Sequence, residues 1–285
     1  ALPIYDFDTT SKGIPLLANL QPSGKYFMED LYYAGGIPAV MKELDSFLNR
    51  ETIAVSGKPI SQNYQNSQCY NRDVIATITE PFNLAAGITV VKGNLCENGA
   101  VLKPSAASTA LMQHTGKAVV FEDIEDYKAR IDDPLLDVDE NSVLVLKNAG
   151  PKGYPGMPEV GNMSIPKKLL AKGITDMVRI SDGRMSGTGF GTVVLHVSPE
   201  AAAGGTIAIV QNGDLIKLDV FNKELTIELS AEEIAERKRH LKPNHPLAER
   251  GYTFLYQQNV EQAHLGADFG FLKGGSGSEV LRDSH

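Results

Sequence analysis

A run of serine, threonine and glycine residues between Arg179 and Thr192 is the stretch of this sequence best equipped for chemistry. The run reads Arg-Ile-Ser-Asp-Gly-Arg-Met-Ser-Gly-Thr-Gly-Phe-Gly-Thr and places Ser186 and Thr188 among closely spaced glycines. Glycine permits tight turns and lets a ligand approach the main chain. A hydroxyl at such a turn can act as a nucleophile, as a base or as a donor to an anion. The sequence therefore predicts either an active site here or an ordinary polar turn between two elements of a packed core.

A second candidate is Glu159, which follows a loop rich in proline and glycine over residues 148–158. Those residues predict a stiff, extended loop. A lone carboxylate at the tip of a rigid loop suits Mg²⁺, a hard cation that takes oxygen ligands and needs only one or two carboxylates. The alternative is a solvated glutamate, which is the commoner state of an acidic side chain.

Two further charged or titratable residues are candidates for substrate binding. Lys103 follows an apolar run and precedes a proline, and from there its ammonium group could reach an anionic substrate. The alternative is a lysine at a strand end whose ammonium group stays in water. His285 is the last residue of the chain, and it matters only if the tail docks, because chain ends are usually frayed.

Several other chemistries lack the residue spacing that they need. The glycines after Ser186 do not form a dinucleotide or phosphate-binding motif. Asp182 and His196 could partner a serine, but no nucleophile-elbow motif occurs. Cys69 and Cys96 form neither a disulfide framework nor a Cys/His metal motif, and we interpret Cys96 as a structural cysteine.

Composition narrows the class of protein. The chain has 285 residues, 42% of them hydrophobic, with a net charge of −8 and a pI of about 5.3, which argues against nucleic acid as a partner. No apolar run approaches the length of about 20 residues that a membrane span needs. The paucity of cysteine favours a reducing compartment, and we expect a cytoplasmic protein. The chain starts at Ala1 without methionine or a signal-peptide pattern, so we expect a piece of a longer protein.

The pattern of the sequence changes near residue 90. Apolar residues at three- and four-residue spacing predict helices within 24–49, and residues 57–82 are polar and irregular. Short β-rich runs predict strands at 88–91, 118–121, 142–146, 176–180, 206–210, 215–220 and 225–229. Helices are predicted at 122–131, 166–172, 231–239 and 246–262.

These elements predict an α/β fold with a β-rich barrel flanked by helices. Residues 212–214 carry a hairpin signal between two predicted strands, and Ser230 is a plausible N-cap. We predict one domain over 86–285 and a helical region over 1–85 whose apolar faces need a partner. That partner would be another copy of the chain, or the region would be poorly ordered. These faces are formed by Phe27, Leu31, Tyr32, Ile37, Val40, Met41 and Leu44.

Six segments together resemble the dihydroxy-acid and sugar-acid dehydratase family. They are Ser181-Asp-Gly-Arg-Met-Ser-Gly-Thr188, Leu195-His-Val-Ser-Pro-Glu-Ala-Ala202, Gly156-Met-Pro-Glu159, the pair Gly93-Asn-Leu and Lys103-Pro-Ser-Ala-Ala107, and Pro22-Ser-Gly-Lys-Tyr26. The resemblance runs almost from end to end, in the family's order. Its pentonate branch is the more similar, because of the methionine before Ser186 and the ending Arg-Asp-Ser-His.

The resemblance implies a fold and a set of cofactors. It covers the C-terminal half of such an enzyme, with residues 1–85 as the tail of an N-terminal α/β domain and residues 86–285 as a swivelling β/β/α barrel. The family's N-terminal domain carries three cysteine ligands of an iron–sulfur cluster and most Mg²⁺ ligands, including a carbamylated lysine. The cluster implied is 2Fe-2S, and its ligands lie outside this chain.

The resemblance also assigns roles to individual residues. Ser186 matches the serine whose alkoxide takes the C2 proton, and Thr188 matches a neighbouring hydroxyl that contacts substrate. Glu159 matches a Mg²⁺ ligand, and His285 matches a C-terminal histidine that folds back toward the site. The implied enzyme is a homodimer or homotetramer that dehydrates a sugar acid to a 2-keto-3-deoxy acid. The chain alone, with a base but no Lewis acid, is expected to be inactive.

Two alternatives stay open. One is dihydroxy-acid dehydratase of branched-chain amino-acid synthesis, and the other is a non-catalytic module that binds a small acid or a partner. Assays of pentonates against 2,3-dihydroxyisovalerate would separate the two enzymes.

Overall fold

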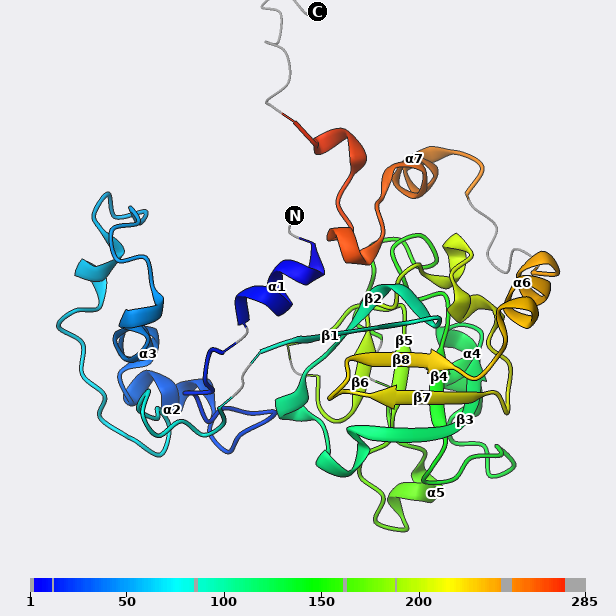
Figure 1. Ribbon diagram of the computed structural model, residues 1–285, viewed down its shortest axis with the longest axis horizontal. Helices are drawn as coiled ribbons and strands as arrows, with labels where there is room; N and C mark the ends of the chain where they lie inside the picture. Colours follow the sequence, from blue (N-terminus) through cyan, green and yellow to red (C-terminus); the bar gives the residue numbers. More distant parts are fainter. Residues whose placement is uncertain are drawn as a thin grey trace, which may run out of the picture.

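An eight-stranded barrel and a smaller helical module make up the computed structural model (Figure 1). The structure describes residues 3–11, 13–84, 87–160, 163–187, 189–241 and 248–274. The strands are β1 (Thr89–Gly93), β2 (Cys96–Leu102), β3 (Gln113–Phe121), β4 (Val143–Leu146), β5 (Arg179–Ser181), β6 (Val193–Leu195), β7 (Leu215–Asp219) and β8 (Glu224–Ile227). The expected α/β barrel is confirmed.

The order of strands around the barrel places the loops that carry the candidate residues. It runs β1, β2, β6, β5, β4, β3, β7, β8. Strands β3, β4, β5 and β6 are parallel neighbours, and the pair Lys92–Glu224 closes the ring between β1 and β8. Because parallel strands end at the same edge of a sheet, the segments that follow β3, β4 and β5 leave the barrel together.

Side chains of the parallel strands alternate between two cores. Val143 and Val145 of β4 point into the barrel, where they pack in its interior core. Leu144 and Leu146 point outward and pack with Phe121 and with Tyr127 of α4. This two-residue alternation, with apolar residues on both faces, is typical of a strand that is covered on both sides.

Helices α1 (Ile4–Ser11), α4 (Ile124–Arg130), α5 (Lys167–Leu170), α6 (Ala231–Arg239) and α7 (Gly251–Asn259) lie around the barrel, and α2 (Met28–Tyr33) and α3 (Gly36–Glu43) belong to the helical module (Figure 1). No helix within the described ranges has the length and apolar character needed to cross a membrane.

The first helix is attached to the barrel and not to the other helices of the N-terminal region. Ile4 packs against Val90 and Val101 on the outer face of the barrel. The Tyr5 hydroxyl donates a 2.8 Å hydrogen bond to the carbonyl of Asn98. The beginning of the chain therefore forms one wall of whatever site lies on this face.

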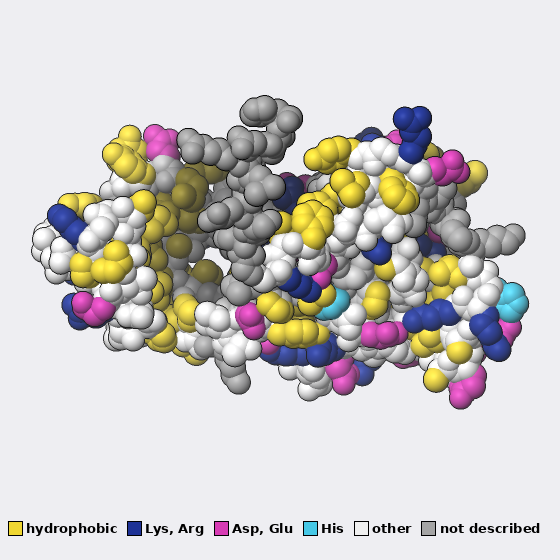
Figure 2. All heavy atoms as spheres, turned by 90° about the horizontal axis from the view of Figure 1, so that it is seen from above, with side chains coloured by type: hydrophobic (Ala, Val, Ile, Leu, Met, Phe, Trp, Pro, Cys, Tyr) yellow, Lys and Arg dark blue, Asp and Glu magenta, His cyan; other side chains and the backbone are white. Residues whose placement is uncertain are grey.

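The helical module has a small core and an uncovered apolar face. Leu31, Ala39 and Ile75 are buried together, so Leu31 finds its partner within the module. Phe27, Tyr32 and Ile37 remain exposed, at 62%, 76% and 57%, and Figure 2 shows hydrophobic side chains gathered on this part of the surface. That this face packs against another copy stays a prediction, as does the domain boundary at 85/86.

The predicted strand at 206–210 is wrong, and so is the hairpin at 212–214. Residues Thr206–Ile209 form a 3₁₀ helix, with Ile207 and Ile209 buried. A short apolar run satisfies a buried turn of helix as well as it satisfies a strand. Two strands escaped the prediction: β2, whose residues Glu97, Asn98 and Gly99 weaken the strand pattern, and β6, which has only three residues.

The N-terminus of α6 gives a first testable prediction. The Ser230 hydroxyl accepts a hydrogen bond from the Glu233 N–H, and the Glu233 carboxylate accepts one from the Ser230 N–H. Loss of this capping box in Ser230→Ala is expected to lower the free energy of unfolding by about 1 kcal/mol. Urea unfolding beside the exposed control Ser56→Ala measures it, and equal midpoints would contradict the prediction.

Candidate functional site

The loop that carries Ser186 connects β5 to β6 and is anchored where it begins. Asp182, which is fully buried, accepts 2.8 Å hydrogen bonds from the main-chain N–H groups of Ala149 and Ala201. Burial, followed by the nearby charge of Glu200, raises the pKa of Asp182 to about 7. The first turn of the serine loop is thus joined to the start of the loop that leads to Glu159.

The same loop is anchored again where it ends. Asp176 accepts hydrogen bonds from the N–H and the hydroxyl of Thr192, and Arg179 donates to the carbonyl of Phe190 at 2.9 Å. Asp176 and Arg179 form a buried ion pair at 3.0 Å. Burial alone would raise the pKa of Asp176, but hydrogen bonds from Ser108 and Thr192 and the charge of Arg179 lower it below its ordinary value.

Two side chains contact the main chain in the middle of the loop, over the three residues Met185–Gly187. Lys103 Nζ donates to the carbonyl of Ser186 at 2.6 Å and to that of Gly187 at 3.1 Å. His196 Nε2 accepts a 2.8 Å hydrogen bond from the Met185 N–H. Hydrogen bonds therefore fix the main chain at three consecutive residues, Met185, Ser186 and Gly187.

A cavity of about 290 Å³ opens beside this segment. Its polar lining consists of Lys103, Ser186, Gly187 and His196. The rest is apolar, and it comes from α1, the barrel face and the serine loop: Ile4, Phe7, Ile88, Val101 and Met185. The described lining of this cavity thus combines a few polar groups with a mostly apolar wall.

His196 is held in its neutral form. Burial, followed by the positive charge of Arg184, lowers the pKa of His196 to about 4. A neutral imidazole has an unprotonated nitrogen that can accept the Met185 N–H, which assigns the ring proton to Nδ1. We therefore expect the contact between His196 and Met185 to persist across the physiological pH range.

This pKa gives a second prediction, on stability against pH. The unfolded chain takes up a proton on His196 near pH 6.5, whereas the folded chain does so only near pH 4. The stabilising contribution is therefore complete above pH 6.5 and is lost as the pH falls through 4, by on the order of 3 kcal/mol. Urea unfolding between pH 7 and 4.5 is expected to show a shallower loss for His196→Gln than for the wild type. Parallel curves would contradict it.

Glu159 lies outside this cavity but is connected to the serine loop. Its carboxylate pairs with Arg184 at 2.9 Å, and both side chains are about half exposed. An exposed carboxylate oxygen suits one position around Mg²⁺. The described residues contain no group of three or more His, Cys, Asp or Glu side chains that could hold a metal ion, so the role of Glu159 as a metal ligand stays a prediction.

The two cysteines do not fit a cluster site. Burial, followed by the charge of Glu97, raises the pKa of the Cys96 thiol to about 12, whereas a metal ligand must be a thiolate. Cys69 Sγ lies within hydrogen-bonding distance of the Asn71 and Ile75 carbonyls in the helical module. The interpretation of Cys96 as a structural residue agrees with its burial.

Glu200 is a buried carboxylate that the sequence did not single out as a candidate. It accepts hydrogen bonds from the N–H groups of Lys152 and Gly153 and from the Gln262 amide, and burial raises its pKa. Glu200 thereby ties the beginning of the Glu159 loop to the C-terminal segment. The sequence signal that could have indicated Glu200 is its place in the His-Val-Ser-Pro-Glu segment, which is one of the segments that resemble the family.

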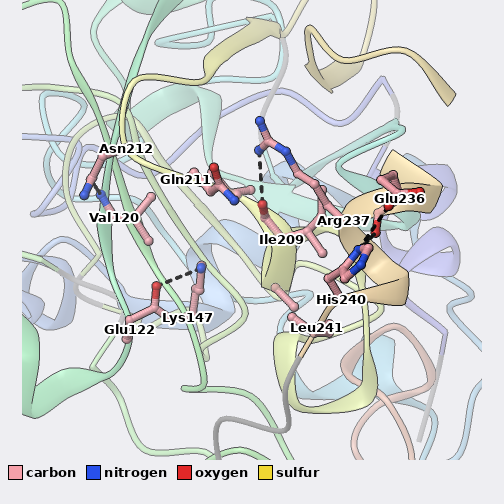
Figure 3. Close-up of a pocket in the computed structure, with 12 residues that line it drawn as sticks. Val120, Glu122, Lys147, Ile209, Gln211, Asn212, Glu236, Arg237, His240 and Leu241 are labelled. Atoms are coloured by element: carbon pink, nitrogen blue, oxygen red, sulfur yellow. Dashed lines mark hydrogen bonds and ion pairs between the residues drawn. The ribbon is translucent and has the colours of Figure 1, made fainter. Parts of the chain in front are cut away.

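A larger cavity of about 590 Å³ lies elsewhere, between the ends of β3 and β4 and helix α6 (Figure 3). Lys147 pairs with Glu122 at 2.9 Å, and Arg237 pairs with Asp214 at 2.6 Å. Lys147 and Glu122 of its lining are thus paired with each other, Arg237 is paired with a residue outside the lining, and none of the candidate residues lines it.

The structure brings Ser186 and Lys103 together and adds His196 to them. Glu159 reaches the serine loop through Arg184. Thr188 and His285 lie outside the described residues.

Comparison with known proteins identifies the family of this chain. A sequence model described as dihydroxy-acid/6-phosphogluconate dehydratase C-terminal matches residues 73–267, and the corresponding N-terminal model matches residues 1–63. An L-arabinonate dehydratase of Rhizobium leguminosarum bv. trifolii is 54% identical over all of this chain and 49% of its own length.

Two further relatives extend the comparison. An L-arabonate dehydratase of Azospirillum brasilense is 47% identical over all of this chain and 50% of its own length. A dihydroxy-acid dehydratase of Carboxydothermus hydrogenoformans is 41% identical over 91% of this chain and 47% of its own length. The chain spans about half the length of the curated relatives it matches. On these matches, the chain belongs to the dihydroxy-acid/6-phosphogluconate dehydratase family.

Proposed function

We propose that this chain forms the C-terminal half of a hydro-lyase that converts a sugar acid into a 2-keto-3-deoxy acid. The observation that carries the proposal is the fixed main chain of Ser186 at the wall of a cavity, between Lys103 and His196. The chain is more identical in sequence to two pentonate dehydratases than to a dihydroxy-acid dehydratase, which supports a sugar acid as the substrate.

Ser186 is the proposed base. It takes the proton from C2 of a 2,3-dihydroxy acid, the C3 hydroxyl takes up a proton and leaves as water, and the resulting enol rearranges to the 2-keto acid. An alcohol is a weak base unless positive charge lies close to it. The Lys103 ammonium group, bonded to the carbonyl of Ser186, supplies one such charge and favours the alkoxide.

The remaining candidate residues bind substrate or metal in this proposal. Lys103 keeps a third N–H that can donate to the substrate carboxylate, and Thr188 and His285 contact the substrate. Glu159 supplies one ligand to Mg²⁺. The described residues contain too few ligands for the Mg²⁺ and 2Fe-2S cluster that the resemblance implies, so both groups would be held chiefly by residues outside this chain. When bound, they supply Lewis acidity.

One observation favours the second candidate substrate. The cavity beside Ser186 is lined largely by Ile4, Phe7, Ile88, Val101 and Met185. A branched aliphatic group fits such a surface better than a hydroxylated chain does. The substrate of dihydroxy-acid dehydratase carries such a branched group. We rank it second because the pentonate dehydratases are the more similar relatives. We also propose a cytoplasmic homodimer or homotetramer, in keeping with two free cysteines and the exposed apolar face of the helical module.

Assays of the intact dehydratase test the function. Purified protein loaded with its metals is incubated with L-arabinonate, D-xylonate or 2,3-dihydroxyisovalerate, and 2-keto acid formation is followed. The proposal predicts that kcat/KM for a pentonate exceeds that for the branched acid roughly tenfold or more. A preference for the branched acid would select the second candidate, and turnover of neither acid would favour a non-catalytic module.

A further inference from the structure

We infer that Lys103 and His196 are positioning residues that hold the three-residue segment Met185–Gly187 in place and thereby aim the Ser186 hydroxyl. The inference relies on the proposed function only for the catalytic role of Ser186. The contacts themselves can be tested without any assay of turnover.

The lysine half of the arrangement comes from strand β2. Lys103 follows that strand directly and lies two positions after Val101, so both side chains project from the outer face of the barrel toward the cavity. There Lys103 Nζ donates to two consecutive carbonyls, those of Ser186 and Gly187. Burial lowers the pKa of this lysine. A partly desolvated ammonium group binds carbonyl oxygens more strongly than a fully hydrated one does.

The histidine half comes from strand β6, the neighbour of β2 in the barrel. His196 follows β6 directly, and its φ of +56° lies in the left-handed region that residues other than glycine rarely adopt. This conformation accompanies the 2.8 Å contact between Nε2 and the Met185 N–H. An unusual backbone conformation of this kind is retained when the surrounding contacts determine it.

Packing confines Met185 and Ser186, but it does not confine Gly187. A Cβ atom added at Gly187 would meet no atom within 4 Å, and Gly187 is exposed. Glycine has the greatest conformational freedom of any residue. The polar contacts of Lys103 and His196 therefore add to the packing of Met185 and Ser186 and restrict the one residue that packing leaves free, Gly187. Accurate placement of a base is a large part of catalysis.

Hydrogen exchange on the chain itself tests the contacts. In His196→Asn, the new side chain tolerates the positive φ but is too short to accept from the Met185 N–H. In His196→Gln, the side chain has an acceptor at a length similar to that of histidine. We expect the amide of Met185 to exchange about tenfold faster in His196→Asn and close to the wild-type rate in His196→Gln, with unchanged thermal midpoints. Lys117→Met, at an exposed position of β3, serves as the control. Wild-type exchange of Met185 in His196→Asn would overturn the inference for His196.

Kinetics of the intact dehydratase test the role of Lys103. A misplaced base slows proton abstraction, so Lys103→Met is expected to lower kcat about a hundredfold with little change in KM. It is also expected to increase the isotope effect of C2-deuterated substrate, and Lys103→Arg is expected to restore most of the rate. A raised KM with unchanged kcat would leave Lys103 only its proposed contact with the substrate carboxylate and overturn the inference that it positions Ser186. Lack of turnover by the wild type would instead refute the proposed function, and the exchange experiment would still stand.

Discussion

Replacement of Ser186 by alanine is expected to reduce turnover of a pentonate by at least about a thousandfold, because a positioned general base contributes roughly 10²–10⁴ to a rate. The fold is expected to persist. Ser186 is only 6% exposed, but the described contacts of the loop at this point use main-chain atoms, namely the Met185 N–H and the carbonyls of Ser186 and Gly187. Truncation of the side chain leaves these main-chain contacts in place.

Two measurements separate loss of the base from loss of structure. Exchange of the substrate C2 proton with deuterated solvent, followed by NMR, is expected in the wild type and absent in Ser186→Ala. Thermal unfolding of the two proteins is expected to coincide. Ser56→Ala, which removes an exposed hydroxyl far along the chain, is expected to behave as wild type. A Ser186→Ala enzyme that keeps a tenth of the wild-type rate would remove Ser186 from the mechanism.

Replacement of Arg179 by methionine is expected to lower the free energy of unfolding by about 3–5 kcal/mol, the usual consequence of removing one partner of a buried ion pair. Asp176 would be left as a buried charge without its counterion, since the side chains of the pair are only 7% and 8% exposed. The carbonyls of Met163 and Phe190 would also lose a donor. Methionine is close to arginine in length, so the lost charge and hydrogen bonds outweigh the lost volume.

Urea unfolding at pH 7 measures this effect. The matched control is Lys128→Met, which breaks an exposed pair with Glu125 and is expected to change the free energy of unfolding by less than about 1 kcal/mol. A second variant, Arg179→Lys, retains the charge without the guanidinium fork and is expected to fall between the two. A loss of under 1 kcal/mol in Arg179→Met would show that Asp176 is satisfied without its partner.

The sequence predicted best those elements whose pattern reflects burial on both faces. The strand at 142–146 and the helix at 231–239 were found within a residue of their ends, because apolar periodicity and capping are local properties. Strand β2 was missed because Glu97, Asn98 and Gly99 interrupt its apolar pattern. Its pairing with β1 and β6 is a tertiary property that no local pattern encodes.

The candidate site was predicted as a set of residues but not as an arrangement. Ser186 and Lys103 were identified, and their contact is a finding of the structure. His196 was considered only as a possible triad partner. Its actual contact, through Nε2 to the Met185 N–H, depends on a left-handed backbone conformation that the sequence does not reveal. The roles of Thr188, Glu159 and His285 stay predictions.

Closure of the barrel also determines when this chain can fold. The Asn94 side chain bonds both main-chain groups of Ile227, 133 positions further on, and β1 pairs with β8 at the same seam. Bringing such distant segments together costs about 4 kcal/mol of chain entropy before any contact offsets it, and folds dominated by such contacts form slowly. During synthesis, the barrel cannot close until β8 has left the ribosome. Until then β1 presents an unpaired edge to other chains, which makes this seam the part of the nascent protein most in need of protection.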